Sequence, residues 1–130
     1  LLNPQRTIPP GISKLTGITP AMVEDAPYFA DIADRFEAFM ADAIFVAHNV
    51  DFDYGFISRE FARIGRPFRH AKLCTCASMR KLYPGLRSYS LAALSRHFGI
   101  SLEQHHRALC DAEAAAELLL LVNERRLSQQ

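Results

Sequence analysis

A short apolar run that breaks into a polar turn is the feature that most restricts the fold of this chain. Residues 44–47 read Ile-Phe-Val-Ala, and residues 48–53 read His-Asn-Val-Asp-Phe-Asp. An apolar run of this length beside turn-forming residues is typical of a buried parallel strand. Asn49 or Asp51 can cap the helix that follows. The pattern therefore predicts a strand, a tight turn and a helix.

Elsewhere the apolar residues recur mostly at helical spacing. Thr19 and Pro20 form a helix start, and the prolines and glycines of residues 3–17 indicate an extended loop. We expect helices near residues 20–25, 29–40, 50–64, 77–82, 90–98 and 111–126, and a second strand at residues 71–75. About six helices are a poor match for two short strands. Either the fold is mainly helical, or further strands lie upstream.

Helical spacing also predicts which side chains face the core. Apolar residues at steps of three and four form one face on each of three helices. The expected inward-facing side chains are Phe29, Ile32, Phe36, Phe39 and Met40, then Phe52, Phe56, Ile57, Phe61 and Ile64, and finally Ala115, Leu118, Leu119 and Val122.

Composition restricts the domain organisation. The 130 residues, 49% of them hydrophobic, are enough for one core, so we expect a single domain over residues 1–130. The sequence has no apolar run of about 18 residues, so no membrane span and no membrane partner are expected. Cys74, Cys76 and Cys110 are an odd set without metal-ligand spacing. They favour free thiols and a cytoplasmic location.

The net charge is only +1, but the charges are unevenly distributed. Residues 61–102 contain no Asp or Glu. Their basic members are Arg63, Arg66, Arg69, Lys72, Arg80, Lys81, Arg87 and Arg96. Such a stretch could form a face that attracts phosphates. Alternatively, the acidic flanks balance these charges in three dimensions.

Two carboxylates follow the first predicted strand. Side chains just past the C-terminal end of a strand point into the crevice where open α/β sheets bind ligands. Asp53 falls in the first turn of the next helix, so its carboxylate can project back toward that crevice. Asp51 is its rival for this role. The alternative is that both are ordinary helix-start acids that complement the helix dipole.

A histidine and a third carboxylate precede and open the last predicted helix. His106 and Asp111 would lie about 140° apart on a helix, so they converge only if His106 sits in the loop before it. A histidine there suits deprotonation of a water, because its ordinary pKa is near neutral. The alternative is a pair of surface histidines, His105 and His106, ahead of a helix capped by Asp111.

Together these segments resemble the second and third motifs of the DEDDh 3′→5′ exonucleases, a family that includes the proofreading epsilon subunit of bacterial DNA polymerase III. The spacing His-Asn-x-x-Phe-Asp from His48 matches the second motif, with Asp53 as its carboxylate. The spacing His-x-Ala-x-x-Asp from His106 matches the third, with Asp111 as its carboxylate. A Leu-Thr-Gly-Ile turn at residues 15–18 is a further similarity.

The resemblance implies an α/β fold of the RNase H-like exonuclease type, with a central mixed sheet flanked by helices. It implies an enzyme that releases nucleoside monophosphates from a nucleic-acid 3′ end with two divalent metal ions, Mg²⁺ or Mn²⁺. Asp111 would bind a metal directly, and Asp53 would do so partly through water. His106 would be the general base.

The resemblance also implies residues that bind the 3′-terminal nucleotide. Thr16, Gly17 and Ile18 would line its pocket, where glycine lets the backbone approach closely. Phe52 would pack beside the terminal base, although a core position is the usual one for phenylalanine. His48 and Asn49 complete the substrate-binding candidates.

One element of the family pattern is absent from the sequence. The first motif, an Asp-x-Glu-Thr-like strand, supplies two of the four metal-binding carboxylates. We therefore expect the chain to be the C-terminal part of an exonuclease domain, without its N-terminal strands, and to be weak or inactive alone. The expected partners are a single-stranded 3′ end, DNA in preference to RNA, and a DNA polymerase in replication proofreading or repair.

Three alternatives remain open from the sequence. The first is an RNA exonuclease similar to RNase T or oligoribonuclease, since that choice depends on contacts to the 2′ position. The second is a module that binds nucleic acid or a polymerase without cleavage. The third is a helical interaction domain in which the motif similarities arise by chance.

Overall fold

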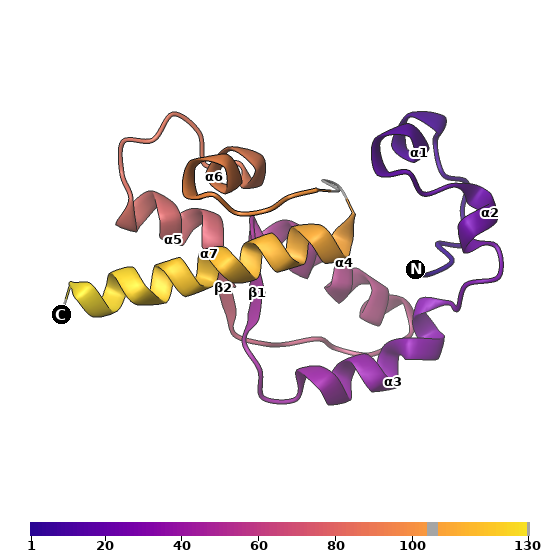
Figure 1. Ribbon diagram of the computed structural model, residues 1–130. Helices are drawn as coiled ribbons and strands as arrows, with labels where there is room; N and C mark the ends of the chain where they lie inside the picture. The colour runs from indigo at the N-terminus through magenta and orange to yellow at the C-terminus, as the bar shows by residue number, and fades with distance from the viewer. Residues whose placement is uncertain (104–106, 130) are drawn as a thin grey trace. The chain divides into compact units, whose positions relative to one another are not determined.

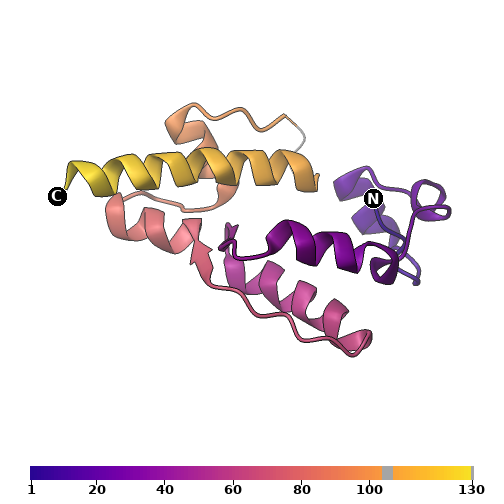
Figure 2. The same cartoon turned by 90° about the horizontal axis from the view of Figure 1, so that it is seen from below.

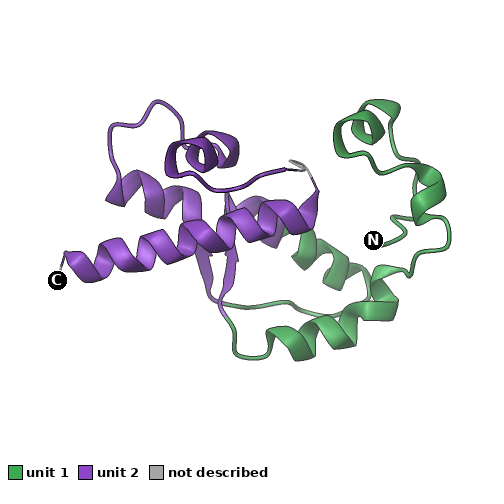
Figure 3. Ribbon diagram, viewed as in Figure 1, with its two compact units in different colours: residues 1–43, 55–70 green, residues 44–54, 71–130 purple. Residues whose placement is uncertain are grey.

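The computed structural model describes residues 1–103 and 107–129 (Figure 1). Its described elements, in chain order, are α1 (Pro10–Thr16), α2 (Pro20–Val23), α3 (Phe29–Met40), β1 (Phe45–Ala47), α4 (Val50–Arg63), β2 (Lys72–Cys74), α5 (Thr75–Leu82), α6 (Leu91–Phe98) and α7 (Ala108–Ser128). They form two compact units (Figure 3). Unit 1 comprises residues 1–43 and 55–70, and unit 2 comprises residues 44–54 and 71–130.

Unit 2 contains the predicted strand, turn and helix. β1 and β2 are parallel neighbours, with Ala47 as the register partner of Cys74. Both strands therefore end at the same edge of the pair. α4 begins at Val50 and α5 at Thr75, so a helix N-terminus follows each strand directly.

The core of unit 2 lies among α5, α6 and α7. α7, orange to yellow in Figures 1 and 2, runs beside α5 and also contacts α6 and β1. The buried members of this cluster are Met79, Leu82, Leu94, Leu118 and Val122. Ala115 is also buried and Leu119 is half-buried, as the helical spacing predicted.

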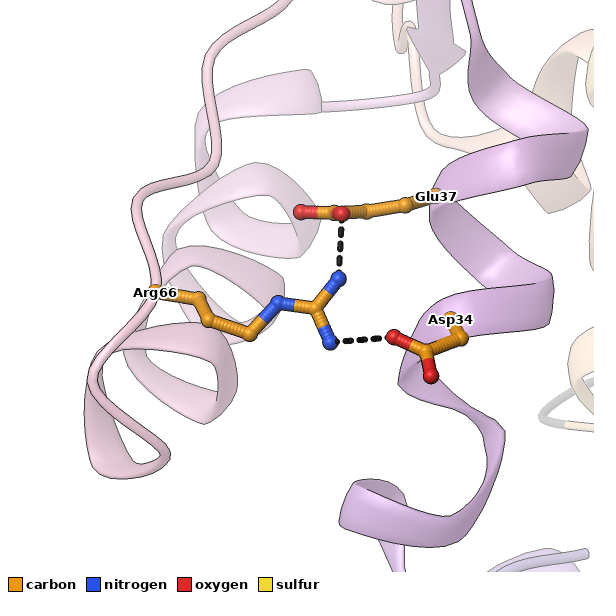
Figure 4. A network of polar contacts seen from close by, with 3 residues as sticks. All are labelled: Asp34, Glu37 and Arg66. Carbon is orange, nitrogen blue, oxygen red and sulfur yellow. Dashed lines mark hydrogen bonds and ion pairs between the residues drawn. The ribbon is translucent and has the colours of Figure 1, made fainter.

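Unit 1 is built around aromatic rings. Phe61 is fully buried, and its ring centroid lies 5.0 Å from that of Phe29 and 5.0 Å from that of Phe68. Arg66 covers this cluster, with its guanidinium carbon 5.5 Å from the Phe61 centroid. The same guanidinium binds two carboxylates of α3, those of Asp34 at 2.7 Å and of Glu37 (Figure 4).

Several local expectations are wrong. Residues 10–16, expected in an extended loop, form α1, because Pro10 occupies a first-turn position where proline is tolerated. Phe39 and Phe52, expected in the core, are 86% and 68% exposed. Phe56 and Ile64 are exposed as well. Periodicity identifies an apolar stripe, but only the packing of the chain decides how much of it is covered.

Some basic residues of the stretch 61–102 are balanced by acidic residues, and others form no ion pair with a described residue. Arg66 is neutralised by α3, Arg63 pairs with Glu60 at 2.9 Å, and Lys72 pairs with Asp51 at 2.8 Å. In residues 1–103 and 107–129, no salt bridge forms at the remaining basic side chains of this stretch. These are Arg69, Arg80, Lys81, Arg87 and Arg96.

Candidate active site

Two helix N-termini carry the carboxylates that the motifs predicted. Asp53 lies in the first turn of α4, just past the end of β1. Asp111 lies in the first turn of α7, and its backbone N–H donates to the carbonyl oxygen of the N-cap residue Arg107 at 3.0 Å. Acidic side chains are favoured there because they face the positive end of the helix dipole. Both residues belong to unit 2.

The two carboxylates lie close enough to affect each other's charge. The pKa of Asp53 is raised, first because its carboxyl group is partly withdrawn from water. A hydrogen bond from its own backbone opposes this, and the negative charge of Asp111 raises the pKa further. The tertiary structure thus brings together two acids that are far apart in the sequence.

Such a pair fits a hard divalent cation. Mg²⁺ is usually held by one or two carboxylates, together with waters and substrate phosphates. A cation between Asp53 and Asp111 would also relieve their mutual repulsion. Within the described part of the chain there is no cluster of three or more His, Cys, Asp or Glu side chains. The rival acid Asp51 is 2.8 Å from Lys72 Nζ and is held there.

The predicted site residues also include His106 and the turn at residues 16–18. His106, the expected general base, lies outside the described residues. Thr16, Gly17 and Ile18 belong to unit 1, where they end α1. The Thr16 hydroxyl donates to the Ile12 carbonyl at 2.9 Å and accepts from the Ile18 N–H at 3.1 Å. Gly17 has a φ of 74°, a left-handed conformation that favours glycine.

His48 joins three segments of unit 2 at the end of β1. Its Nε2 lies 2.6 Å from the Tyr89 carbonyl oxygen, which can only accept a hydrogen bond, so Nε2 carries the proton. Its Nδ1 lies 2.8 Å from the hydroxyl of the buried Thr75. Burial lowers the pKa of His48 despite the Tyr89 bond, and the positive charge of Arg80 lowers it further. The ring is therefore neutral and accepts from Thr75.

We expect the free energy of unfolding to fall as the pH drops below 6.5, the ordinary pKa of His48. The pKa is lowered in the folded state, so the unfolded chain binds more protons below that pH and is favoured there. Above it both states are neutral, and the contribution is constant. Denaturation by urea at several pH values measures the slope. His48→Gln should have a smaller slope, and equal slopes in the two proteins would refute this account.

Asn49 directly precedes α4, and Phe52 lies in its first turn. Asn49 has a φ of 63°, and its carbonyl oxygen accepts the Phe52 N–H at 3.0 Å. Asparagine tolerates this left-handed conformation better than most residues. The exposed ring of Phe52 stands one residue before Asp53.

Cys74 has a thiol whose pKa is lowered, a feature that the sequence reasoning missed. Burial raises the pKa of its thiol, but backbone N–H groups of Ala77, Val50, Asn49 and Cys76 outweigh this, and the net pKa is lowered. These groups come from the N-termini of α4 and α5, which meet at the ends of the two strands. A cysteine at the junction of a strand and a helix was the available signal.

Iodoacetamide is expected to label Cys74 at a lower pH than Cys76. The pKa of Cys76 is raised, mainly by burial, and the thiolate is the nucleophile. Peptide mass spectrometry after brief labelling across a pH series gives the half-maximal pH for each thiol. Because each thiol is compared with its own plateau, the difference in exposure cancels. A half-maximal pH for Cys74 at or above that of Cys76 would contradict the prediction.

Comparison with known proteins identifies the class to which this fold and site belong. Residues 1–119 match the sequence profile of the exonuclease family, and the chain belongs to that family. A solved structure of exonuclease X in complex with 5′ overhanging duplex DNA superposes with a TM-score of 0.66. It is 28% identical in sequence, and the match covers 94% of this chain and 69% of that one. The α/β exonuclease fold is thereby confirmed.

The chain is also similar to DNA polymerase III proteins and to a 3′-5′ exonuclease. DNA polymerase III subunit epsilon of Aquifex aeolicus is 39% identical over 125 residues, which is 95% of this chain and 62% of that protein. DNA polymerase III PolC-type of Clostridium perfringens is 39% identical over 91% of this chain and 8% of its own length. The 3′-5′ exonuclease DinG of Staphylococcus aureus is 40% identical over 91% and 13%. The chain spans less than two thirds of each relative.

Proposed function

We propose that this chain forms the active region of a metal-dependent 3′→5′ exonuclease. The observations that carry the proposal are that Asp53 and Asp111 each lie in the first turn of a helix of unit 2, and that the negative charge of Asp111 raises the pKa of Asp53. The family match runs through both units, so we infer that they belong to one domain, as the composition predicted. The relatives include proteins named as 3′-5′ exonuclease and as polymerase subunits, which supports this polarity and a role with a polymerase.

The reaction is hydrolysis of the terminal phosphodiester. A water attacks the phosphorus and the bond from phosphorus to the 3′ oxygen breaks. The 3′ oxygen stays on the shortened strand and takes a proton to become a hydroxyl, and the terminal residue is released as a nucleoside 5′-monophosphate. Asp111 and Asp53 would hold Mg²⁺ or Mn²⁺, and the family pattern has two such ions. When bound, these ions would neutralise the negative charge that builds on the phosphate. His106 would take the proton from the water, a role proposed from the motif alone.

DNA is the proposed substrate. The structural neighbour is named in complex with duplex DNA, and the polymerase relatives act in DNA synthesis by their names. Phe52 and Asn49 would contact the terminal nucleotide because both lie at the start of α4, close in the chain to Asp53. His48 would act indirectly, since both its ring nitrogens bind protein atoms. Thr16, Gly17 and Ile18 remain proposed from the motif.

We also propose a cytoplasmic location. In residues 1–103 and 107–129 no helix has the length and apolarity needed to cross a membrane. The three cysteines are free thiols. Together with the replication relatives, these support a cytoplasmic protein.

The test is degradation of a 5′-labelled single-stranded oligodeoxynucleotide with Mn²⁺, at high concentrations of this chain. A ladder that shortens from the 3′ end and is lost in His106→Ala would support the exonuclease. We expect the cleavage to depend on Mn²⁺, because Asp53 and Asp111 would hold the cation. Strand binding without any cleavage would favour a binding module. A matched RNA strand tests the alternative substrate.

A further inference from the structure

Unit 2 has a polar hollow beside the proposed site. Its volume is about 480 Å³, and it lies among the end of β1, the helix α5 and the segment that leads into α6. The polar residues that line it are Asn49, Arg80, Arg87, Ser88, Tyr89 and Ser90. Asn49 precedes Asp53 by one turn of chain, so the hollow and the carboxylate pair share the start of α4.

Two arginines without an ion pair to any residue that the structure describes line the hollow. They are Arg80 and Arg87. By contrast, Arg63, Arg66 and Lys72 of the same basic stretch each pair with a carboxylate. Two guanidinium groups at one depression are suited to an anion, since arginine presents several N–H donors in a fixed plane.

The wall of the hollow is held in place by hydrogen bonds. The Tyr89 hydroxyl donates to the Tyr83 carbonyl at 2.6 Å and accepts from the Leu86 N–H at 3.2 Å. The Tyr89 carbonyl accepts from His48. The Arg80 guanidinium carbon lies 5.5 Å from the centroid of the Tyr89 ring, which positions it at this wall. A fixed wall lowers the entropic cost of binding.

Hydroxyl groups add neutral donors. The Ser88 and Ser90 oxygens are 3.3 Å apart, and Ser90 also caps α6 by accepting the Ala93 N–H at 3.1 Å. Phosphate oxygens in nucleic-acid complexes are bound by arginine, serine and asparagine groups of this kind, whereas the Tyr89 hydroxyl is already bound to the protein. The chemistry therefore matches an anion such as a phosphate better than an apolar ligand.

We propose that this hollow binds a backbone phosphate of the substrate strand, separate from the phosphate that reacts at Asp53 and Asp111. The proposal rests on the proposed function for its assignment to the substrate. It gives the chain a second contact with the strand, which would fix the register of the 3′ end without reading the base sequence.

The test is strand affinity measured without divalent metal. A fluorescein-labelled single-stranded oligodeoxynucleotide is titrated with the wild type, with Arg80→Gln/Arg87→Gln and with Arg96→Gln, read by anisotropy at several salt concentrations. We expect the double variant to bind about tenfold more weakly for every base sequence, and its salt slope to fall by about 0.7. Arg96 is exposed on α6 and does not line the hollow, so its variant should keep the wild-type slope.

Neutral linkages distinguish a strand phosphate from a free one. A single methylphosphonate is placed at successive positions from the 3′ end. One position should weaken binding to the wild type but not to the double variant. Loss of affinity in the double variant equal to that in Arg96→Gln would overturn the proposal. The proposal would also be overturned if inorganic phosphate competed with the strand while no methylphosphonate position weakened binding. That result would assign the hollow to a free anion.

Binding without metal is independent of cleavage. If the exonuclease proposal fails, the strand will not be shortened, but its binding will still weaken when the two arginines are replaced. If the proposal for the hollow fails, the strand will be shortened in the presence of metal, but its binding will not weaken when the two arginines are replaced.

Discussion

Replacement of Asp111 by asparagine is expected to lower the rate of Mn²⁺-dependent shortening about a thousandfold. A bound metal supplies several kcal/mol of stabilisation to the charge that develops on the phosphate, and about 4 kcal/mol corresponds to a factor of roughly a thousand. Asparagine keeps the shape of the side chain but loses the charge that holds the cation. Gel analysis of single-turnover reactions measures the rate, and electron paramagnetic resonance of free Mn²⁺ measures binding.

A matched control variant distinguishes loss of the metal-binding carboxylate from loss of any negative charge on α7. Glu113 is exposed on α7, two residues beyond Asp111. Glu113→Gln should retain both cleavage and Mn²⁺ binding. Unchanged cleavage and Mn²⁺ affinity in Asp111→Asn would exclude this site as the metal centre.

Replacement of Phe61 by alanine is expected to destabilise unit 1 by about 3–5 kcal/mol, the usual cost of removing a buried phenylalanine. Phe61 has no exposed surface, and its ring touches those of Phe29, Phe36 and Phe68. It also underlies Arg66, so the variant weakens the anchoring of that guanidinium over the cluster. Urea denaturation followed by circular dichroism measures the loss.

Phe39→Ala provides the contrast on α3. The Phe39 side chain is 86% exposed, so its removal should change the free energy of unfolding by less than about 0.5 kcal/mol. The sequence pattern places both phenylalanines on inward faces, so the pair tests the packing rather than the pattern. Similar losses in the two variants would mean that the aromatic cluster is not the core of unit 1.

The local elements could be predicted from the sequence. An apolar run before a polar turn predicted β1 and α4, and helical spacing predicted α3, α5, α6 and the inward face of α7. The motif spacings selected Asp53 and Asp111. These features follow from short-range rules, because strand and helix periods and helix-start preferences depend on residues a few positions apart.

Only the tertiary structure decided which groups meet. Asp53 and Asp111 influence each other's charge although they are far apart in the sequence, because α7 packs against β1, the strand that leads into α4. Lys72 is neutralised by Asp51, whereas Arg80 and Arg87 are left at a shared hollow. His48 binds Thr75 and Tyr89 instead of presenting its ring. Burial, charge pairing and side-chain convergence arise from contacts between residues distant in sequence, and periodicity contains no information about those contacts.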